Sequence, residues 1–339
     1  MKKPPIILNF EKIWRILPFN RPKKEKLKYL LFSSFPFLFN RLAVFQNWKN
    51  AQIFKDKSLS FWSLKSWKMS FSKSYLINIH TEKGIKKASN PKLAVAVHAF
   101  YPDIFHEILQ MLEQSKYDKI SLYITAPSDV SKTIEEMLKQ STLPFQLMEV
   151  ENRGRDILPF LKILPQIFAD GNELILKIHT KKSNHLNRKD LWRNDLFNKL
   201  IGVGAINKAI TIFEKNNAIG IIGPTNHILP MYYYYGGNAL RVIGLGKKMG
   251  VDDCYLNNLN FVAGSMFYAR KVALLPILNL GLNDSDFEIE NLQTDGTMAH
   301  AVERAFAVSL LAAGLQLSDT NYNNINPALT VSKDHYFTI

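Results

Sequence analysis

Short apolar runs alternate with segments of helical periodicity from residue 93 onward. In the first helical segment, residues 102–114, the side chains of Ile104, Ile108 and Met111 recur at a spacing that places them on one helix face. The intervening runs are rich in Val, Ile, Leu and Ala, which is typical of buried parallel strands. Four such strands are predicted, at residues 93–100, at 119–128, within 144–154, which also includes the exit loop, and at 173–183. This order predicts an α/β fold with a mainly parallel sheet flanked by helices.

The second half of the chain has a less regular pattern. Helices are predicted at residues 191–202, 205–215 and 293–314 and from Lys271 onward, and strands at residues 217–224 and 261–270. Residues 225–260 are expected to be loop-like, because four consecutive tyrosines, Tyr232 to Tyr235, precede Gly236-Gly237 and Asn238. Aromatic side chains in such a loop either stack on sugar rings or pack against the domain, and both interpretations stay open.

The positive charge of the chain is concentrated before the first strand. Residues 1–92 hold 20 lysines and arginines against 4 acidic residues, whereas the remainder holds 23 against 25. Four of the five tryptophans also lie in this segment. The turn signal Ser89-Asn90-Pro91 divides the chain into a basic, aromatic-rich N-terminal segment at 1–90 and a main domain at 91–339. The segment is expected to be a solvated arm, a helical peripheral contact with an anionic membrane, or a nucleic-acid contact, the last disfavoured because no nucleic-acid-binding motif accompanies the charge.

Several classes of protein are excluded by composition. The single cysteine, Cys254, excludes an internal disulfide framework and a cysteine-based metal site. No apolar run of about 18 residues is present, so a membrane span is not expected, and no signal peptide is visible at the start. We therefore expect a cytoplasmic protein, in contact with the inner face of the cytoplasmic membrane if the basic segment binds lipid. P-loop, dinucleotide-binding and nucleophile-elbow motifs do not occur.

Polar side chains follow all four predicted strands. Because the carboxyl ends of parallel strands meet at one edge of a sheet, these side chains are expected to form one polar, mainly basic rim there. The rim residues are His98 and Tyr101, then Thr125 and Ser128, then Glu151, Asn152, Arg153, Arg155 and Asp156, and finally His179, Thr180, Lys181 and Lys182. Any one of these residues alone is better explained as a helix cap or a solvated strand end than as a functional residue, but their occurrence at four strand ends points to a binding site.

Six motifs in this order carry a family resemblance: VHAFYPD, ENRGRDILPFL, LKIHTKKS, WRNDL, FVAGSMFYAR and QTDGTMAHAVER. Across residues 93–306 the chain resembles the rhamnan synthesis protein F family of bacterial cell-surface polysaccharide biosynthesis. The resemblance implies a glycosyltransferase of GT-A-like fold acting in surface polysaccharide or O-antigen assembly. A D-x-D metal motif usually ends the fourth strand of that fold, whereas Lys177 to Lys182 occupy this place here. We therefore expect a metal-independent enzyme without a cofactor.

The resemblance implies roles for the rim residues on the donor side. A departing nucleoside diphosphate gains negative charge, and Arg153, Arg155, Lys181 and Lys182 are candidates to offset it. Asp156 either pairs with an arginine or contacts the ribose. Donor binding is accordingly predicted at His98, Tyr101, Asn152, Arg153, Arg155, Asp156, Lys181 and Lys182, and sugar or acceptor binding at Tyr235, Asn238 and Gly264.

Asp295 is the first candidate for the base that deprotonates the acceptor hydroxyl, because it matches in order the acidic motif of inverting GT-A enzymes. The competing interpretation is that Asp295 caps the following helix. His179 is a second catalytic candidate and His98 a rival, since neutral imidazole takes up a proton near pH 7. Glu303 and Arg304 are expected to form an ion pair or to pack.

The predicted reaction transfers a sugar, with rhamnose suggested by the family name, from a dTDP- or UDP-linked donor to a glycan or lipid-linked acceptor. The alternative is a non-catalytic carbohydrate-binding or scaffold module that recruits partner transferases. A phosphate-ester enzyme that uses the same basic rim is the third hypothesis.

Overall fold

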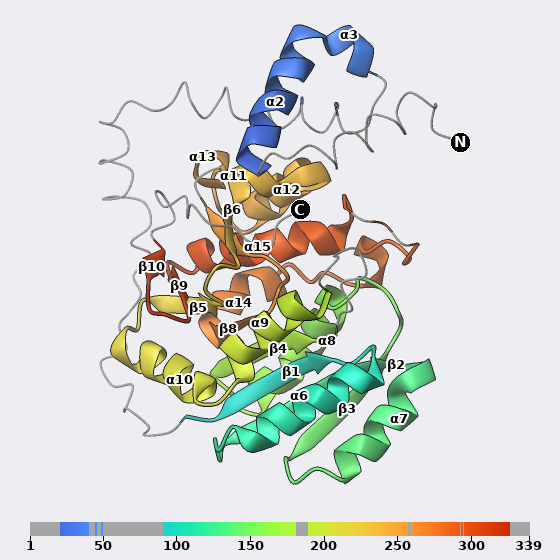
Figure 1. The fold of residues 1–339 in the computed structure, drawn as a ribbon, viewed down its shortest axis with the longest axis vertical. Coiled ribbons are helices and arrows are strands. Elements are labelled where there is room, and N and C mark those ends of the chain that lie inside the picture. Colours follow the sequence, from blue (N-terminus) through green and yellow to red (C-terminus); the bar gives the residue numbers. More distant parts are fainter. Residues whose placement is uncertain are drawn as a thin grey trace.

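The computed structural model describes residues 21–40, 45, 49, 91–180, 189–256, 259–291, 293 and 295–325. Within these residues the chain forms one large mixed sheet with helices on both faces (Figure 1). The prediction of an α/β fold with a mainly parallel sheet flanked by helices is confirmed. Most of segment 1–90 lies outside the described residues, so its predicted boundary at residue 90 stays a prediction.

The large sheet has eight strands in the order β10-β9-β5-β8-β4-β1-β2-β3. Strands β1 to β4 are mutually parallel, and β8 runs antiparallel between β4 and β5. The carboxyl ends of β1 to β5 therefore lie at the same edge as the amino end of β8. The strand bounds are β1 Leu93–His98, β2 Ile120–Pro127, β3 Phe145–Val150, β4 Leu174–His179, β5 Ile219–Gly223, β8 Phe267–Arg270, β9 Gln316–Asp319 and β10 Asn324–Ile325.

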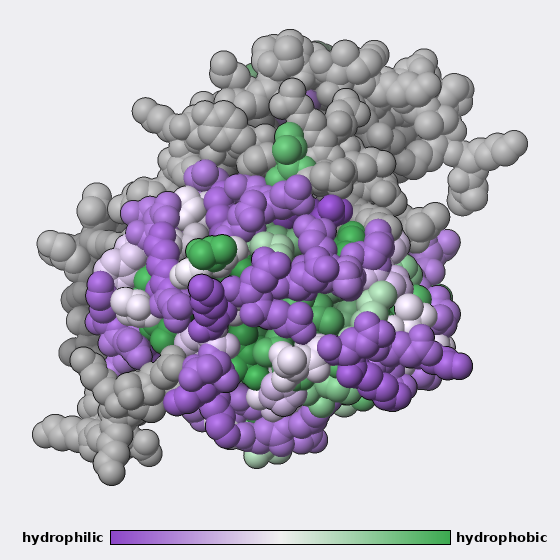
Figure 2. Space-filling model, turned by 60° about the horizontal axis from the view of Figure 1, so that its bottom comes forward, coloured by the Kyte–Doolittle hydropathy of each residue, from purple (hydrophilic) through white to green (hydrophobic). Residues whose placement is uncertain are grey.

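Four helices cover one face of this sheet: α6 Pro102–Gln114, α7 Ser128–Lys139, α9 Lys189–Ile201 and α10 Ala205–Lys215. Helix α6 buries Ile104, Ile108 and Leu112 against Val95 and Val97 of β1, as its periodicity predicts. It begins with Pro102, whose fixed φ suits the first helical position. Seen from the end that carries α6 and α7, the surface is largely hydrophilic, with a smaller group of apolar side chains (Figure 2).

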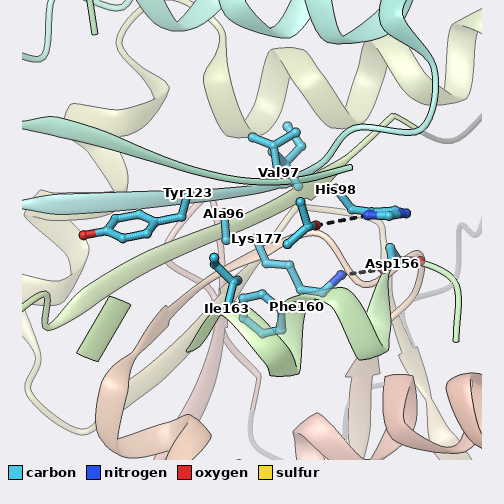
Figure 3. A pocket seen from close by; sticks show the side chains of 10 residues that line it. Ala96, Val97, His98, Tyr123, Asp156, Phe160, Ile163 and Lys177 are labelled. Atoms are coloured by element: carbon cyan, nitrogen blue, oxygen red, sulfur yellow. Dashed lines mark hydrogen bonds and ion pairs between the residues drawn. The ribbon is translucent and has the colours of Figure 1, made fainter. Parts of the chain in front are cut away.

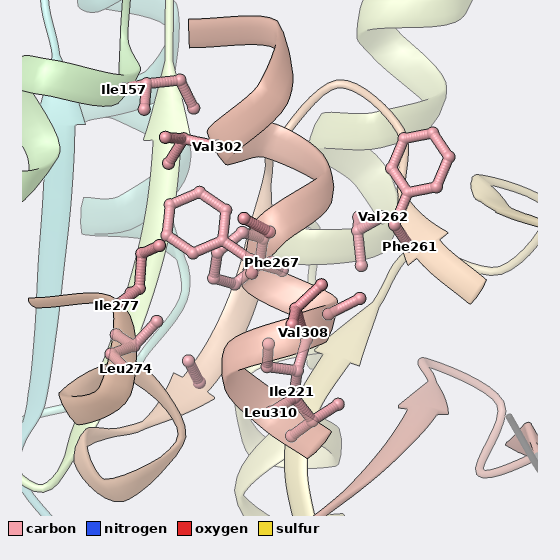
Figure 4. Close-up of a cluster of buried hydrophobic side chains, with 14 of the residues drawn as sticks. Ile157, Ile221, Phe261, Val262, Phe267, Leu274, Ile277, Val302, Val308 and Leu310 are labelled. Atoms are coloured by element: carbon pink, nitrogen blue, oxygen red, sulfur yellow. The ribbon is translucent and has the colours of Figure 1, made fainter. Parts of the chain in front are cut away.

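The opposite face carries the larger core, which surrounds α15 Met298–Ala312 (Figure 4). Val302, Val308 and Leu310 of α15 pack with Phe267 of β8 and Ile221 of β5. Around α15 lie α8 Ile157–Ala169, α12 Ala239–Lys248 and α14 Lys271–Leu278, the β6 Ile228–Pro230 and β7 Asn260–Val262 pair, and the short helices α11 Met231–Tyr234, α13 Asp253–Leu256, η1 Gly236–Asn238 and η2 Asp284–Asp286.

Two helices, α2 Arg21–Ser34 and α3 Pro36–Phe39, precede the main domain and lie at the end of the molecule far from β3 (Figure 1). No single helix among the described residues is long and apolar enough to cross a bilayer. The segments Leu191–Ile201 and Ala205–Lys215, bent by 56°, meet that requirement of length and composition only as a pair.

Two predictions of local structure are wrong. Residues 225–260 are not loop-like, since they contain α12, whose Val242 and Ile243 are buried in the core around α15. Residues 261–270 do not form one strand either. Gly264 and Ser265 both have positive φ, of 84° and 51°, so the chain turns between β7 of the small sheet and β8 of the large one.

Candidate functional site

A row of polar side chains stands at the carboxyl edge of the sheet. His98 of β1 is in register with Thr125 of β2 and His179 of β4, so the three side chains point to the face that α8 covers. His98 Nδ1 lies 3.0 Å from Thr125 Oγ1 (Figure 3). Burial lowers the pKa of His98 to about 4, against a smaller opposing effect of Asp156. His98 is therefore neutral at neutral pH.

An ion pair lies directly below this row. Lys177 points from β4 to Asp156, which immediately precedes α8, with Nζ 2.5 Å from Asp156 Oδ2 (Figure 3). Lys177 Nζ also donates to the carbonyl of Ser265 at 2.9 Å, and the Ser265 hydroxyl donates to the same Asp156 oxygen. The Lys177 side chain is 1% exposed. Burial alone would raise the pKa of Asp156, but His179, Lys177 and the hydrogen bonds outweigh it, so this pKa lies far below its ordinary value.

His179 and Thr180 connect the end of β4 to its neighbours. His179 Nε2 donates to the carbonyl of Gly264 at 2.9 Å and lies 3.8 Å from Asp156 Oδ2. Thr180 Oγ1 accepts the backbone N–H groups of Phe100 and Tyr101 at 2.8 and 2.9 Å. Tyr101 is half-buried beside these contacts. Thr180 thus fixes the loop that follows β1.

Gly264 joins this edge to α15 and α9. Its backbone N–H donates to Glu303 Oε1 at 2.7 Å. A Cβ at Gly264 would lie 2.9 Å from the Trp192 ring, so glycine is required both for this contact and for the positive φ. Glu303 also lies 3.3 Å from Arg304, which confirms the expected ion pair and adds a main-chain contact to it.

A further histidine and carboxylate lie beyond Trp192. His227 Nε2 and Lys199 Nζ each lie 2.6 Å from Asp195 Oδ2, and Trp192 contacts the His227 ring edge to face. Burial lowers the pKa of His227 despite the hydrogen bond to Asp195. The WRNDL motif thus supplies a structural connection between α9 and the loop after β5.

Asp295 lies in a second cluster with the tyrosine- and glycine-containing segment. Its oxygens accept the Gly237 backbone N–H at 2.9 Å and the Asn238 side-chain amide at 2.7 Å. Asn238 also donates to the carbonyl of Tyr235 at 2.9 Å, so the predicted base and two predicted sugar-binding residues come together. Burial would raise the pKa of Asp295, but these hydrogen bonds and the charge of Arg304 bring it below its ordinary value. The capping interpretation is wrong, since the cap of α15 is Thr297.

The two arginines of the rim face the acidic segment 283–293. Arg153 donates to the carbonyls of Asp284 and Phe287 at 3.1 and 3.2 Å. Arg155, which has a left-handed φ of 55°, donates to the carbonyl of Gln293 and lies 3.8 Å from Glu290. Both guanidinium groups thus hold a segment that leads to Asp295.

The structure therefore sorts the predicted site residues into three groups. His98, Tyr101, Asp156, His179 and Gly264 share the carboxyl edge of the sheet, and Tyr235, Asn238 and Asp295 share the second cluster. Arg153 and Arg155 hold the acidic segment, with Asn152 exposed beside them. Lys181 and Lys182 lie outside the described residues.

Arg304 and Glu303 connect the two clusters. Arg304 donates to the carbonyl of Tyr234 at 2.7 Å, beside the second cluster, while Glu303 accepts from Gly264 at the sheet edge. The Arg304 guanidinium also lies 5.1 Å from the centre of the Phe261 ring. Helix α15 thus carries the contacts that join both halves of the candidate site.

The pocket beneath His98 and Asp156 is small. Its empty volume of about 180 Å³ is lined by Ala96, Tyr123, Phe160 and Lys177 among others (Figure 3). This volume includes open solvent, and the enclosed space has no room even for a water molecule, so a sugar nucleotide would lie outside this pocket, along the edge above it. Among the described residues, no group of three or more His, Cys, Asp or Glu side chains is placed to hold a metal ion.

Sequence reasoning missed Lys177 and Ser265 as members of the site. The signal for Lys177 is present, because a lysine within the apolar strand LILKIH must find a buried partner. Ser265 carries no comparable signal, since its place depends on the turn between β7 and β8.

The fold and the edge site define an α/β protein whose polar groups collect where parallel strands end. The chain belongs to the rhamnan synthesis protein F family, whose family model matches residues 53–314. It is 35% identical over 227 residues to the uncharacterized protein WxcX of Xanthomonas campestris pv. campestris strain B100, and equally to that of strain ATCC 33913. The match covers 66% of this chain and 32% of the relatives, so the chain spans about a third of their length.

Among solved structures, 4-diphosphocytidyl-2C-methyl-D-erythritol synthase from Anaerococcus prevotii is similar over 71% of this chain and 91% of its own. The TM-score is 0.35 and the sequence identity is 8%. The predicted family resemblance is confirmed by the family match.

Proposed function

We propose that this protein is a glycosyltransferase of GT-A-like fold, which transfers a sugar from a nucleotide-sugar donor to a glycan or lipid-linked acceptor in surface polysaccharide synthesis. One observation carries the proposal: in a member of a polysaccharide-synthesis family, His98, Asp156 and His179 from the first half of the chain meet Gly264 and Ser265 from the second half. They meet at the carboxyl edge of the parallel strands, where α/β proteins place their ligands.

The donor would lie along this edge. Thr180 and His179 end β4 with their side chains engaged, and Lys181 and Lys182 follow directly in the chain. A lysine about 4 Å from a phosphate contributes roughly 4 kcal/mol at an effective dielectric constant near 20. A lysine at this point of the chain would therefore offset part of the charge of a leaving diphosphate in a metal-independent reaction. Arg153 and Arg155 would act indirectly, by positioning the segment that leads to Asp295.

The acceptor would be deprotonated by Asp295. Its hydrogen bonds to Gly237 and Asn238 hold the carboxylate in one orientation, and its lowered pKa keeps it ionised at neutral pH. Asn238 donates both to this carboxylate and to the Tyr235 carbonyl, and the side chains of Tyr235 and Asn238 are buried, so these two residues would position Asp295 without contacting the sugar. In this scheme Asp295 takes the proton of the acceptor hydroxyl, the acceptor oxygen forms a bond to the anomeric carbon of the donor sugar, and the bond from that carbon to the diphosphate breaks on the opposite face.

The test is donor turnover by the full chain with a panel of dTDP- and UDP-linked sugars. Asp295→Asn should lower turnover by about a hundredfold or more, with donor affinity unchanged within a few-fold. Glu214→Gln is the control, because this exposed carboxylate on α10 precedes β5 at the opposite edge. Near-normal turnover by Asp295→Asn would show that another group is the base.

Two further measurements separate the alternatives. If the wild-type chain consumes none of the donors yet is stabilised by a glycan, the carbohydrate-binding scaffold replaces the transferase. Thermal stabilisation by dTDP or by UDP would identify the donor nucleotide, with about 2.7 kcal/mol expected at a hundredfold excess over Kd. Turnover that is lost in EDTA and restored by manganese would contradict the metal-independent reaction.

A further inference from the structure

The helices α2 and α3 expose a run of large apolar side chains. Leu30, Phe35, Phe37 and Leu38 are 60%, 47%, 73% and 65% exposed, within nine consecutive residues. A single exposed apolar side chain is ordinary on a protein surface, whereas several close together mark an interaction site, and here the rings of Phe35 and Phe37 lie 6.5 Å apart. We name these four side chains the apolar tip.

The apolar tip is held by an internal aromatic contact. Phe32 is buried, with its ring 4.9 Å from that of Phe39 and 5.2 Å from that of Phe45. The backbone N–H of Phe35 donates to Leu31, and that of Leu38 to Phe35, so α3 continues from α2 with one break. Phe32, Phe39 and Phe45 thus fill the inside of the turn between α2 and α3, while Phe35 and Phe37 remain exposed.

The sequence of α2 is strongly basic. Within RPKKEKLKYLLFSS, five cationic residues accompany one glutamate, and they all precede the apolar tip. Positive charge followed by exposed aromatic and aliphatic side chains is complementary to a bilayer with anionic head groups: the charges attract the surface and the apolar groups enter the interface. At four residues, α3 is far too short to span a bilayer.

We propose that the apolar tip docks this protein on an anionic lipid bilayer. Phe37 and Leu38 enter the boundary between head groups and acyl chains. In Figure 1, α2 runs from beside α12 out to α3, so its positive charge stands behind the tip and attracts the anionic surface over a longer distance. Figure 1 shows α2 and α3 at the end of the molecule away from α6 and α7, so docking through the tip leaves that end unobstructed. The inference does not depend on the proposed transferase activity.

The experiment is flotation of the full chain with vesicles of phosphatidylglycerol and phosphatidylcholine, and with vesicles of phosphatidylcholine alone. The wild-type chain should float with the anionic vesicles and much less with the neutral ones. Phe37→Ser combined with Leu38→Ser should lower the partition coefficient by about tenfold or more. Lys24→Gln combined with Lys28→Gln should lower it by less, up to roughly fivefold per charge. Val203→Ser, at a 96% exposed position between α9 and α10, is the matched control and should float like wild type.

Three results would overturn the proposal. They are a wild-type chain that does not float with anionic vesicles, a tip variant that floats like wild type, and equal binding to neutral vesicles. If the tip variant instead changes the sedimentation of the lipid-free protein, the tip contacts a second copy of the chain. Circular dichroism of each variant separates loss of binding from loss of folding, and no outcome depends on donor turnover.

Discussion

Replacing Lys177 with methionine tests the buried ion pair at the candidate site. Methionine keeps most of the volume of the side chain but removes its charge, which leaves the Asp156 carboxylate without its partner at 2.5 Å. The attraction at this distance is about 7 kcal/mol at an effective dielectric constant near 20, before the cost of removing both charges from water. Breaking a buried pair from one side usually costs about 3–5 kcal/mol, because the remaining charge stays buried.

A second lysine–carboxylate pair, with nearly the same distance between its charged atoms, serves as the control. Lys162 lies 2.6 Å from Asp284, but the two side chains are 31% and 47% exposed. Such a surface pair contributes about 1 kcal/mol or less, so Lys162→Met should change stability little. The two ion pairs thus differ in burial and hardly in the distance between their charges, so a difference between the two variants reports on burial.

The assay is urea unfolding followed by far-UV circular dichroism. Lys177→Met should lower the free energy of unfolding by about 3–5 kcal/mol, and adding Asp156→Asn should recover part of the loss. A loss below about 1 kcal/mol, equal to that of Lys162→Met, would show that burial does not determine the cost of losing the partner charge. Full additivity of the two substitutions would mean that the charges do not interact.

Three other predictions concern the same region. Because the pKa of His98 is lowered from 6.5 to about 4, the unfolded chain takes up a proton first as the pH falls. Stability should therefore drop by up to roughly 3 kcal/mol between these two pH values, and His98→Asn should flatten that slope in urea titrations; an unchanged slope would contradict the burial argument. Gly236→Ala should reduce both stability and turnover, because the added Cβ would lie 2.1 Å from Asp295 at a residue whose φ is 56°. Unaltered turnover would show that the conformation of this turn does not affect the base. Gly264→Ala should lower the melting temperature more than Gly171→Ala, which has a similar φ but no neighbour within 4 Å, and equal losses would mean that the Trp192 contact is unimportant.

Strands β1, β2 and β4 could be predicted from the sequence because burial on both sheet faces leaves a simple apolar run, whereas only Val150 is buried in the edge strand β3. The runs predicted at 93–100 and 119–128 became Leu93–His98 and Ile120–Pro127. Helix α12 was not predictable in the same way. Its two internal glycines, Gly244 and Gly246, lower helix propensity, and packing of Gly246 against Val308 and Leu256 compensates only in the folded chain.

The candidate site shows a similar division. That polar residues gather at the carboxyl edge follows from the strand pattern, whereas the pairing of β1 with β4, which puts His98 beside His179, does not. The partners of Arg153 and Arg155 do not follow, because carbonyls of the segment 283–293 lie more than a hundred residues away in the chain. A sequence shows where an arginine lies in the chain, whereas only the tertiary structure shows whether its guanidinium group is already hydrogen-bonded to a carbonyl.

The antiparallel strand between β4 and β5 has a consequence for any attempt to divide the protein. A fragment that ends after α13 retains β1 to β4 but lacks β8, which pairs with Leu174 to Lys177 of β4. The open backbone groups of β4 would then invite strand addition by another molecule, and such fragments should aggregate. Shortened versions intended for biochemistry should therefore be trimmed only before β1 or after β10.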